Sequence, residues 1–564
     1  MTLATPPGPS PSPAIALAPP LARRLWPRRP TARPAPARAW ALAGLALLAT
    51  ALPAPAQQEA PEWTEWWSAH RQDYLVPHRL VPSKEEQEAE AEGTVTRKKI
   101  PKVEEINEFA LAQIDDPWPA VRMAAAFLLA RTSGEKALPV LRGRLEKDDG
   151  SQQHPLLLAI GLTTAPEAVD LLVDVIEDGM LGRQRLALRS DAFATLGLGL
   201  AREHGQREAV DAAIEKLLKR RKLGDEVQHA LLTLAALSPS PALEEYCREQ
   251  ARNRQAQIFV RRRAAASLAS YPGDKSAKVL LDTFKDASDV DLVRSVALAL
   301  GAMPGDGHAK ALVKLYQREG EQHIKAHLLT SLGRNAGVGT LDALIEAFEG
   351  GNTALRDFAL IGLALYTREH DAPRADQVLL AALANRSSDT RKEVVVLACG
   401  LARLPEAVTA LAELVASGDT QPVRANAALA LGLIGDEAAR EQLLAAGGNQ
   451  KGSQTLPEIV GGLGLIGDPR DGETLVGWVR GLKANERRAA AIQFLALHGS
   501  LEVIDGLVQF GGDQSEDGPT RAAALQALGL LYEDGPRPIS GRPLRFERNP
   551  TFPEWLASLW AMSY

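Results

Sequence analysis

The chain is poor in aromatic residues, and this shortage limits how it can fold. Only 5% of its 564 residues are aromatic, although 45% are hydrophobic, so a core must be built from Ala, Leu, Val and Ile. Small, helix-favouring side chains of this kind suit closely packed helices. The chain is also too long for one ordinary hydrophobic core. The composition therefore favours an elongated helical array.

Cysteine is scarce as well, because only Cys247 and Cys399 are present. They lie four to five units apart in the repeat described below, and stacked helix pairs advance by on the order of 10 Å each. The two sulfurs cannot reach disulfide geometry, so packing alone must stabilise the fold. Cys399 lies in an apolar run and has no paired His, which indicates a small core residue and not a nucleophile.

The N-terminus lacks acidic residues and predicts export. Residues 1–37 are rich in Pro, Ala and Arg, and an apolar run from Trp40 to Leu52 precedes Ala54-Pro55-Ala56. A basic lead, a short apolar stretch and a small-x-small site predict a signal peptide over residues 1–56. A membrane span needs about 20 residues, so we expect a periplasmic or secreted protein without a stable membrane span, or a membrane-anchored one if the signal is not cleaved.

The net charge gives no reason to expect a nucleic acid partner. Cleavage after residue 56 would remove six Arg and no acid, which takes the formal charge from −6 to −12. An acidic surface does not attract a phosphate backbone. We therefore expect a protein or peptide partner and no nucleic acid.

A repeat of about 32 residues runs along most of the chain. A small residue follows the last core Leu of each unit, at Ala130, Gly161, Gly197, Ala235, Ala269, Gly301, Gly333, Ala364, Gly400, Gly432, Gly464, Ala496 and Gly529. Each unit holds one helical pattern that is apolar nearly all round, as in Ala427–Ile434, and one amphipathic pattern, as in His308–Arg318. The pattern predicts a buried helix and a solvent-facing helix in each of thirteen units over residues 103–533.

The repeat resembles the HEAT family, in particular the short bacterial repeats of the phycobilin-lyase type. The resemblance rests on an Asp-rich turn followed by Val423-Arg424, Ala427-Ala428 and Leu431-Gly432. It implies an all-α, armadillo-like, right-handed α-solenoid, a curved superhelix with the Val-Arg helix on its inner side. It also implies a protein-binding scaffold. The units between Gly197 and Ala269 depart from the regular length.

The two ends of the chain hold most of the remaining tryptophan. Residues 57–102 carry an aromatic stripe of Trp63, Trp66 and Trp67, followed by a charged linker, and residues 534–564 form a Pro-rich segment that ends in aromatic residues. Terminal units of a solenoid need covers, so we expect two aromatic-rich caps, the first packed on the first unit. Stacking of these Trp residues on sugar rings is the alternative. This arrangement resembles exported HEAT-repeat proteins of unassigned function.

Two motifs suggest ligand sites but have simpler interpretations. Gly462–Gly467 satisfies G-x-G-x-x-G, yet it falls inside a repeat helix and lacks the strand that a dinucleotide loop requires. His323 and His327 are four residues apart, a spacing that can hold zinc, with His308 as the nearest third ligand. We expect two polar residues on a helix edge, and neither a metal nor a cofactor.

Arginines at one repeat position suggest an anion-binding ladder, or bonds to carbonyls and turn Asp residues that hold the units together. These are Arg122, Arg294, Arg356, Arg424 and Arg521. The second role is the one we expect. The densest basic runs, 219–222 and 261–263, are interpreted as solvated faces, with an acidic partner segment as the alternative.

No catalytic constellation is visible, because P-loop, HExxH, GxSxG and paired-carboxylate patterns are all missing from the sequence. The sequence therefore predicts a non-catalytic scaffold that binds a protein or peptide along its inner face. The alternatives are an enzyme or enzyme subunit of lyase-like type, with a site in the irregular units or the ends, and a carbohydrate-binding protein that uses the terminal Trp residues.

Overall fold

The computed structural model describes most of the repeat region and part of the aromatic stripe. The described residues are 63–64, 66–67, 74–75, 102–148, 150, 152–220, 223–303, 305–385, 391–417, 420–449 and 454–532. All of them belong to one compact unit, 60–564. The predicted signal peptide and C-terminal segment lie outside the described residues.

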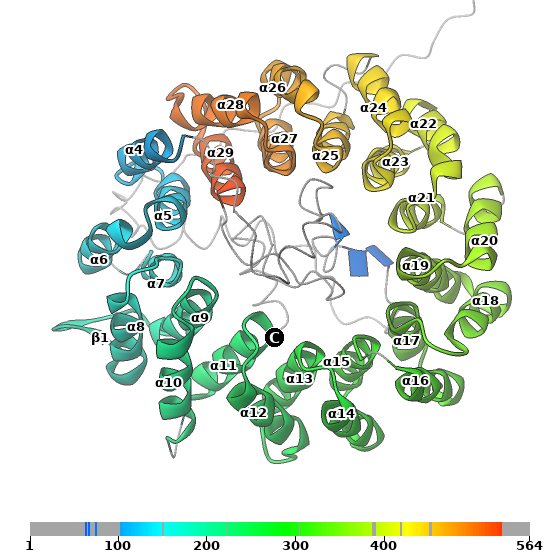
Figure 1. Ribbon diagram of the computed structural model, residues 1–564, viewed down its shortest axis with the longest axis horizontal. Coiled ribbons are helices and arrows are strands. Elements are labelled where there is room, and N and C mark those ends of the chain that lie inside the picture. The colour runs from blue at the N-terminus through cyan, green and yellow to red at the C-terminus, as the bar shows by residue number, and fades with distance from the viewer. Residues whose placement is uncertain are drawn as a thin grey trace, which may run out of the picture. The chain divides into compact units, whose positions relative to one another are not determined.

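The described helices form two concentric layers (Figure 1). The inner layer consists of α5 (Pro119–Ser133), α7 (Gln153–Gly161), α9 (Ser190–Glu203), α11 (Asp225–Leu237), α13 (Ile258–Ser267), α15 (Val290–Gly301), α17 (Gln322–Asn335), α19 (Thr353–Glu369), α21 (Lys392–Leu401), α23 (Gln421–Ile434), α25 (Leu456–Ile466), α27 (Asn485–His498) and α29 (Gly518–Leu531). The outer layer consists of α4 (Val103–Gln113), α6 (Ala137–Lys147), α8 (Glu167–Asp178), α10 (Arg207–Leu218), α12 (Pro241–Arg252), α14 (Asp274–Asp286), α16 (Asp306–Arg318), α18 (Thr340–Gly350), α20 (Pro373–Ala384), α22 (Val408–Ser417), α24 (Glu437–Asn449), α26 (Gly472–Gly481) and α28 (Leu501–Gly512).

Each outer helix is followed in sequence by an inner one, which gives thirteen pairs from α4–α5 to α28–α29. Short 3-10 turns, η2 (Gly134–Lys136), η3 (Leu268–Ser270), η4 (Pro405–Ala407) and η5 (Pro469–Asp471), connect some of them. Twelve of the thirteen landmark residues lie in inner helices, and Ala269 lies in η3 directly after α13. The all-α solenoid expected from the repeat is confirmed, with the apolar helix of each unit on the inner side.

The tenth pair shows why each unit folds as it does. The side chain of Thr420 accepts a hydrogen bond from the backbone N–H of Val423 and caps α23, and Pro422 occupies the first turn. A capping hydroxyl and an early Pro both favour a helix start. The helix ends at Gly435, whose φ of 79° is left-handed and therefore suits glycine.

Small landmark residues let the inner helices approach each other closely. A Cβ on Gly333 would lie 2.1 Å from the carbonyl oxygen of Gly362 in α19, and one on Gly161 would lie 2.2 Å from that of Gly197. Real Cβ atoms do not come so near to backbone, so these contacts exclude any larger residue. The expected close approach at the landmarks is therefore present at these two contacts.

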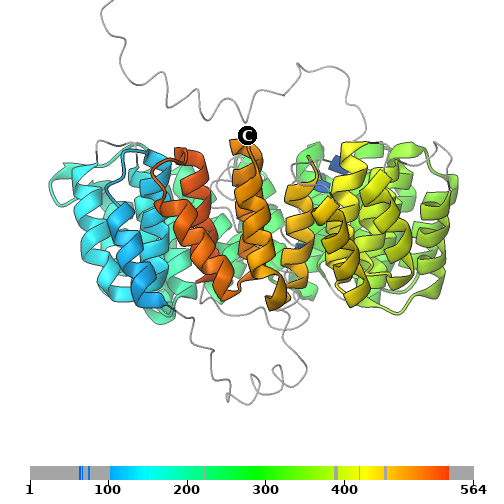
Figure 2. The same ribbon diagram turned by 90° about the horizontal axis from the view of Figure 1, so that it is seen from above.

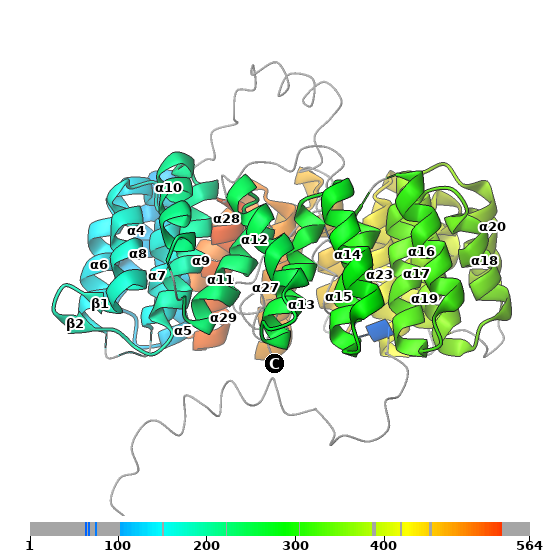
Figure 3. The same cartoon turned by 90° about the horizontal axis from the view of Figure 1, so that it is seen from below.

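The inner layer closes on itself. Every inner helix packs on the inner helix before it and the one after it, and the last, α29, packs on the first, α5. The outer helices α28 and α4 also meet. Figure 1 shows the resulting ring with α29 beside α5, and Figures 2 and 3 show it from two further sides.

A buried ion pair joins the two ends of the ring at this seam. One Nη atom of Arg521 in α29 donates to an Asp116 carboxylate oxygen at 2.5 Å and to the Gln113 side-chain oxygen at 2.7 Å. Its Nε donates to the carbonyl of Gly511 at 3.1 Å. The side chains of Arg521 and Asp116 are 2% and 3% exposed. Almost every polar atom of the pair thus has a hydrogen-bond partner within the protein.

Aromatic side chains from the first unit cover glycines of the last one. A Cβ on Gly518 would lie 2.4 Å from the ring of Trp118, and one on Gly511 would lie 2.9 Å from the ring of Phe109. Lys102 forms a salt bridge with Asp505 beside them. The seam is therefore held by close packing of aromatic rings on glycines, by a buried ion pair and by an ion pair at the surface.

The curved array that the resemblance implies is closed into a ring. Thirteen pairs that complete one turn share 360°, or about 28° each, with no net rise between α5 and α29. An open superhelix needs a rise along its axis with each turn. The first and last units consequently cover each other and do not require a separate cap at the seam.

The irregular spacing between Gly161 and Ala235 arises in one connection and one helix. A two-stranded antiparallel hairpin, β1 (Met180–Leu181) with β2 (Gln184–Arg185), is inserted between α8 and α9. Beyond the landmark Gly197, α9 continues for six residues to Glu203. The inner helices α9 and α11 still pack side by side, so the insertions leave the ring intact.

We expect Arg521→Ala to destabilise the seam strongly, because it leaves Asp116 charged and buried without its cation. Breaking a buried pair in this way costs about 3–5 kcal/mol. Thermal unfolding measures the loss, and small-angle scattering reports whether the ring opens. The double variant Arg521→Leu/Asp116→Leu should recover part of the stability, whereas additive losses from the two sites would contradict the coupling.

Gly333→Ala should destabilise the fold by at least about 2 kcal/mol, since its methyl group meets the backbone of α19. Gly477→Ala is the matched control in α26, where nothing lies within 4 Å of the added Cβ. Because alanine is the better helix former, that control should gain up to about 1 kcal/mol. Denaturant titration distinguishes them, and similar effects at both sites would show that the inner helices are not in close contact.

Candidate functional site

The central turns of many inner helices are buried on every side. In α21 every residue from Val394 to Leu401 is buried, and in α23 the same holds from Ala427 to Ile434. The runs from Ala192 to Gly199 in α9 and from Ala326 to Gly333 in α17 are also buried throughout. In α15, by contrast, Arg294 is exposed and Leu298 is only partly buried.

We call α19, α21, α23 and α25 the covered arc. Its helices are built almost entirely from Ala, Val, Leu, Ile and Gly over their central turns. The run Ile459–Leu465 in α25 is buried throughout, as in α21 and α23. An apolar wall of this length, left open to water, would be an exposed patch of the kind that marks an interaction site.

The aromatic stripe contacts this wall at one point, the C-terminal end of α19. Trp63, Trp66 and Trp67 are 5%, 3% and 8% exposed and belong to the same continuous buried cluster as the inner helices. The Arg368 guanidinium near the C-terminal end of α19 lies over the ring of Tyr74, 5.6 Å from its centroid. Figures 1 and 3 show the short helical pieces of this stripe, in blue, on the inner side of α19.

The position of the stripe differs from the one we expected. We expected Trp63, Trp66 and Trp67 to cover the first unit, but α29 covers α5 there. Arg368, which contacts the stripe through Tyr74, belongs to the eighth pair. The spacing of the stripe predicted that its aromatic face would be buried, and the burial agrees with that. The C-terminal segment, 534–564, lies outside the described residues.

His323 and His327 do not converge on a common ligand in the described structure. We expected both residues on the exposed edge of a helix, but His327 is buried in α17, where its ring meets that of Phe358 edge-on at a centroid distance of 5.8 Å. His308 lies in α16, with a ring nitrogen 3.5 Å from Asp274. The described residues contain no group of three or more His, Cys, Asp or Glu side chains that would hold a metal ion.

The G-x-G-x-x-G string lies in a helix, as its register indicated. Gly462 and Gly464 are within α25, and Gly467 ends that helix with a left-handed φ of 73°. A Cβ on Gly462 would lie 2.5 Å from the carbonyl oxygen of Ala428, and one on Gly464 would lie 2.9 Å from that of Phe494. These two glycines therefore allow neighbouring inner helices to pack.

The repeat-position arginines make bonds within and between units. Arg122 donates to the carbonyls of Asp116 and Pro117 at 2.8 and 3.0 Å. Arg294 pairs with Asp291 of its own helix at 3.3 Å, and Arg521 makes the seam described above. These contacts agree with the structural role that we expected for these arginines.

The irregular units carry buried groups whose chemistry is suppressed. Burial, together with the Arg263 guanidinium, lowers the pKa of His229 to about 4, so this ring is neutral at pH 7. Burial also raises the pKa of the Cys247 thiol in these units, and it raises that of Cys399, which lies in α21 outside them, to about 12. Neither thiol supplies a thiolate at neutral pH, which a cysteine nucleophile requires.

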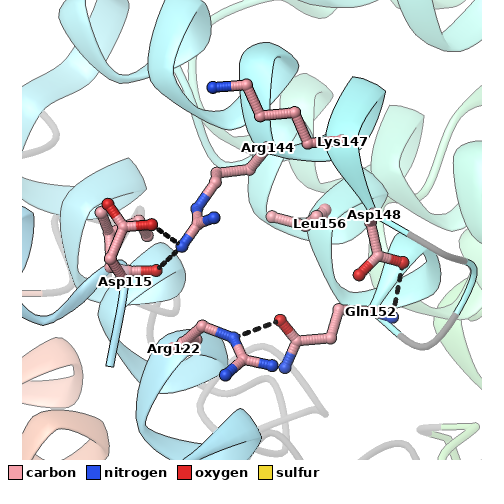
Figure 4. Close-up of a pocket in the computed structure, with 8 residues that line it drawn as sticks. Asp115, Arg122, Arg144, Lys147, Asp148, Gln152 and Leu156 are labelled. Atoms are coloured by element: carbon pink, nitrogen blue, oxygen red, sulfur yellow. Dashed lines mark hydrogen bonds and ion pairs between the residues drawn. The ribbon is translucent and has the colours of Figure 1, made fainter. Parts of the chain in front are cut away.

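A polar hollow of about 390 Å³ lies beside the first two units (Figure 4). Most of its charged side chains are bonded to groups of the surrounding turns. Arg144 donates to the carbonyl of Ile114 and pairs with Asp115, while Arg122 donates to the side-chain oxygen of Gln152 at 3.2 Å. Asp148 accepts two backbone N–H bonds. We assign no ligand to this hollow.

Few signs of the covered arc are visible in the sequence. The runs at Val394–Leu401 and Ile459–Leu465 are apolar on every side, including the side that faces the ring interior, and this could have indicated a cover. The partner of the aromatic stripe was not visible, because about 290 residues separate Tyr74 from Arg368.

Comparison with known proteins identifies no family for this chain. No family model matches, and no curated protein matches. Among solved structures, yeast importin-β (Kap95p) is 14% identical, with 83% of this chain and 66% of that chain covered and a TM-score of 0.35. Human deoxyhypusine hydroxylase is 19% identical, with 47% and 96% covered and a TM-score of 0.22. Kap121p is 11% identical, with 87% and 57% covered and a TM-score of 0.31.

These similarities are too distant to carry a function. The chain spans about two thirds of Kap95p and just over half of Kap121p. The HEAT-repeat-like character of the fold rests on the two-layer helix pairs themselves. None of the described helices is long and apolar enough to cross a membrane.

Asp357 in α19 should make the stability depend on pH. Burial raises the pKa of this carboxyl to about 6 from 3.8, although Arg391, 3.4 Å away, acts in the opposite direction. The folded state thus binds more protons than the unfolded state between these values, and stability falls as pH rises from about 4 to about 6. The loss should be on the order of 2 kcal/mol.

Asp357→Asn should therefore be more stable than the unmodified chain at pH 7.5 and nearly equal to it at pH 4, as measured by denaturant unfolding. Asp342→Asn is the control, because Asp342 pairs with Arg374 at the surface and exposed pairs contribute little. A larger destabilisation of Asp357→Asn at pH 7.5 than at pH 4 would contradict the assignment.

Proposed function

We propose that the protein is a non-catalytic binding scaffold of the cell envelope or exterior, which holds a protein or peptide segment on the inner face of its ring. The observation that supports this most is the covered arc. Its apolar helices share one buried cluster with Trp63, Trp66 and Trp67, whose side chains are almost unexposed. Buried aromatic anchors of this kind dominate the energy of protein interfaces.

The predicted signal peptide supports the location. A basic lead, a short apolar run and a small-x-small site precede the aromatic stripe. The fold is compatible with an oxidising compartment, because the two cysteines are free and fully buried. Neither reaches the surface, where oxidation or mixed disulfides would form.

Solenoids bind partners along extended concave surfaces, and closure makes the inner surface of this chain continuous. The exposed residues of inner helices outside the covered arc, such as Arg294, offer polar contacts next to the apolar wall. This combination of an apolar centre and a polar surround is the usual anatomy of an interface.

In-cell photo-crosslinking tests the proposal. A benzoylphenylalanine at Arg294, on inner helix α15, is compared with one at Lys314, on outer helix α16 of the same pair. Both positions are exposed. We expect the inner position to yield at least about five times more crosslinked partner, because a partner bound on the inner face does not contact the outer helix. Fractionation of the same cells reports the compartment.

Equal yields from the two positions, or crosslinks from Lys314 alone, would overturn the inner-face assignment. A protein found only in the cytoplasmic fraction would overturn the location and leave the binding surface standing. The lyase-like and carbohydrate-binding alternatives have no described feature in their favour, and we do not propose them.

A further inference from the structure

Four arginine side chains are buried in the part of the chain that the structure describes, and three of them hold a carboxylate. The three pairs are Arg202 with Asp211 at 2.7 Å, Arg440 with Asp471 at 2.5 Å and Arg521 with Asp116 at 2.5 Å. The fourth arginine, Arg263 in α13, is 5% exposed and forms no ion pair with a described carboxylate. Arg263 is therefore the exception among the buried cations of this fold.

The neighbours of Arg263 in the sequence do have partners. Arg262 pairs with Asp289 at 2.6 Å, and Arg261 donates to the carbonyl of Ala251 at 3.4 Å. The basic run 261–263 was interpreted from the sequence as a solvated face, but its third member is buried. The burial of Arg263 without an acid thus needs its own explanation.

The Arg263 guanidinium lies between two adjacent inner helices. Its Nε donates a long hydrogen bond of 3.5 Å to Nε2 of His229 in α11, and its Nη2 is buried without a hydrogen-bond partner. The rings of His229 and Phe259 lie 6.0 Å apart, so an aromatic pair borders the cation. The His229 ring is neutral at pH 7, so it accepts one bond and balances no charge.

The site needs a negative charge and not only a further hydrogen bond. Burial lowers the pKa of Arg263 to about 10, so the guanidinium remains protonated at pH 7. A water molecule would satisfy Nη2 but would leave the charge unbalanced, and a buried charge without a partner is costly. The other three buried arginines meet this cost with an internal carboxylate. Arg263 therefore suits an anion that the described residues do not supply.

We propose that Arg263 and His229 form a binding site for one carboxylate group, supplied by an acidic side chain of the protein or peptide segment on the inner face. This inference rests on the proposed inner-face binding function and defines the chemistry of the partner. One guanidinium balances one negative charge, as in the three internal pairs. A phosphate group carries up to two charges at neutral pH and would leave part of its charge buried and unpaired.

The position of the site just below the surface favours tight binding. A charge-assisted bond is about twice as strong as a neutral one, and low-dielectric surroundings strengthen it further. Nη2 is covered in the free protein, so a neighbouring side chain must move before a carboxylate oxygen can reach it. The His229 ring, which is only partly buried and already contacts the guanidinium, is the side chain that moves.

The stability of the free chain provides the first test. Arg263→Met keeps the length of the side chain but removes its charge, so we expect its unfolding equilibrium constant in urea to be at least about 5-fold lower than that of the unmodified chain. Arg440→Met is the contrast, because it leaves Asp471 buried without a cation and should raise that constant. A destabilised Arg263→Met chain would show that Arg263 supports the fold and would overturn the proposal.

Acetate is the probe for the site itself. Replacing about 100 mM chloride by acetate at constant ionic strength and pH should raise the melting temperature of the unmodified chain by about 1–2 °C, as a dissociation constant of about 10 mM implies. Arg263→Met should lose this shift. Arg254→Met is the matched control, because Arg254 is exposed, and it should keep the shift. The same shift in all three proteins, or a larger shift with phosphate than with acetate, would overturn the proposal.

Crosslinking in cells tests whether the carboxylate belongs to a partner. We expect Arg263→Met to reduce the yield of partner crosslinked from benzoylphenylalanine at Arg294 at least about 5-fold, and Arg254→Met to leave it unchanged. Arg263→Lys should retain part of the yield, because it keeps the charge but loses the planar fork. An unchanged yield from Arg263→Met would show that a free carboxylate occupies the site and would overturn the assignment to a partner side chain.

The two proposals fail in different ways. If the inner face binds no partner, the crosslinks from Arg294 are missing in the unmodified chain, while the acetate response through Arg263 persists. If Arg263 does not bind carboxylates, the acetate response is missing, while the crosslinks from Arg294 persist.

Discussion

Every inner helix in this fold is covered on both sides by another inner helix, and the first and last units can meet that need only through each other. The buried pair of Arg521 and Asp116 is the interaction on which this closure depends. Taking both charges out of water is costly, and a buried pair tolerates that cost only when its remaining donors and acceptors are satisfied. Gln113 and the carbonyl of Gly511 provide those partners. The seam is therefore specific in its register, which an apolar contact alone would not ensure.

Closure also determines what the interior can do. Outer helices present charged side chains to solvent, while the arc from α19 to α25 presents an apolar wall to the ring interior. Such a wall is stable in water only when something covers it. At the end of α19 the Arg368 guanidinium lies over the ring of Tyr74, so the aromatic stripe meets the wall there. A partner that binds elsewhere on the wall would bury apolar area of the same kind.

The helices were predictable from the sequence because each helix pair repeats the same pattern of apolar, polar and small residues. Small residues such as Gly333 and Gly432 recur at a nearly constant step, and the amphipathic helix between them reveals the outer layer. The seam was not predictable. Arg521 occupies the same repeat position as Arg122, and Asp116 looks like any turn Asp, so nothing local marks them as partners across 405 residues. Whether the array closes depends on the sum of thirteen small rotations, and a few degrees in each would open it. The aromatic stripe was similar, since its spacing predicted burial but not the wall that buries it.

A ring also fixes the number of its units. An open array can gain or lose a terminal repeat by duplication or deletion of a gene segment and still fold, because only the contact surface of the terminal unit is altered. Here the loss of one pair would leave a gap that α29 could not cross to reach α5, and the gain of one would force the two apart. Extra residues can be added without a change in the number of pairs, as the hairpin of β1 and β2 illustrates. The ring thus accepts added length between its helices but not an added unit.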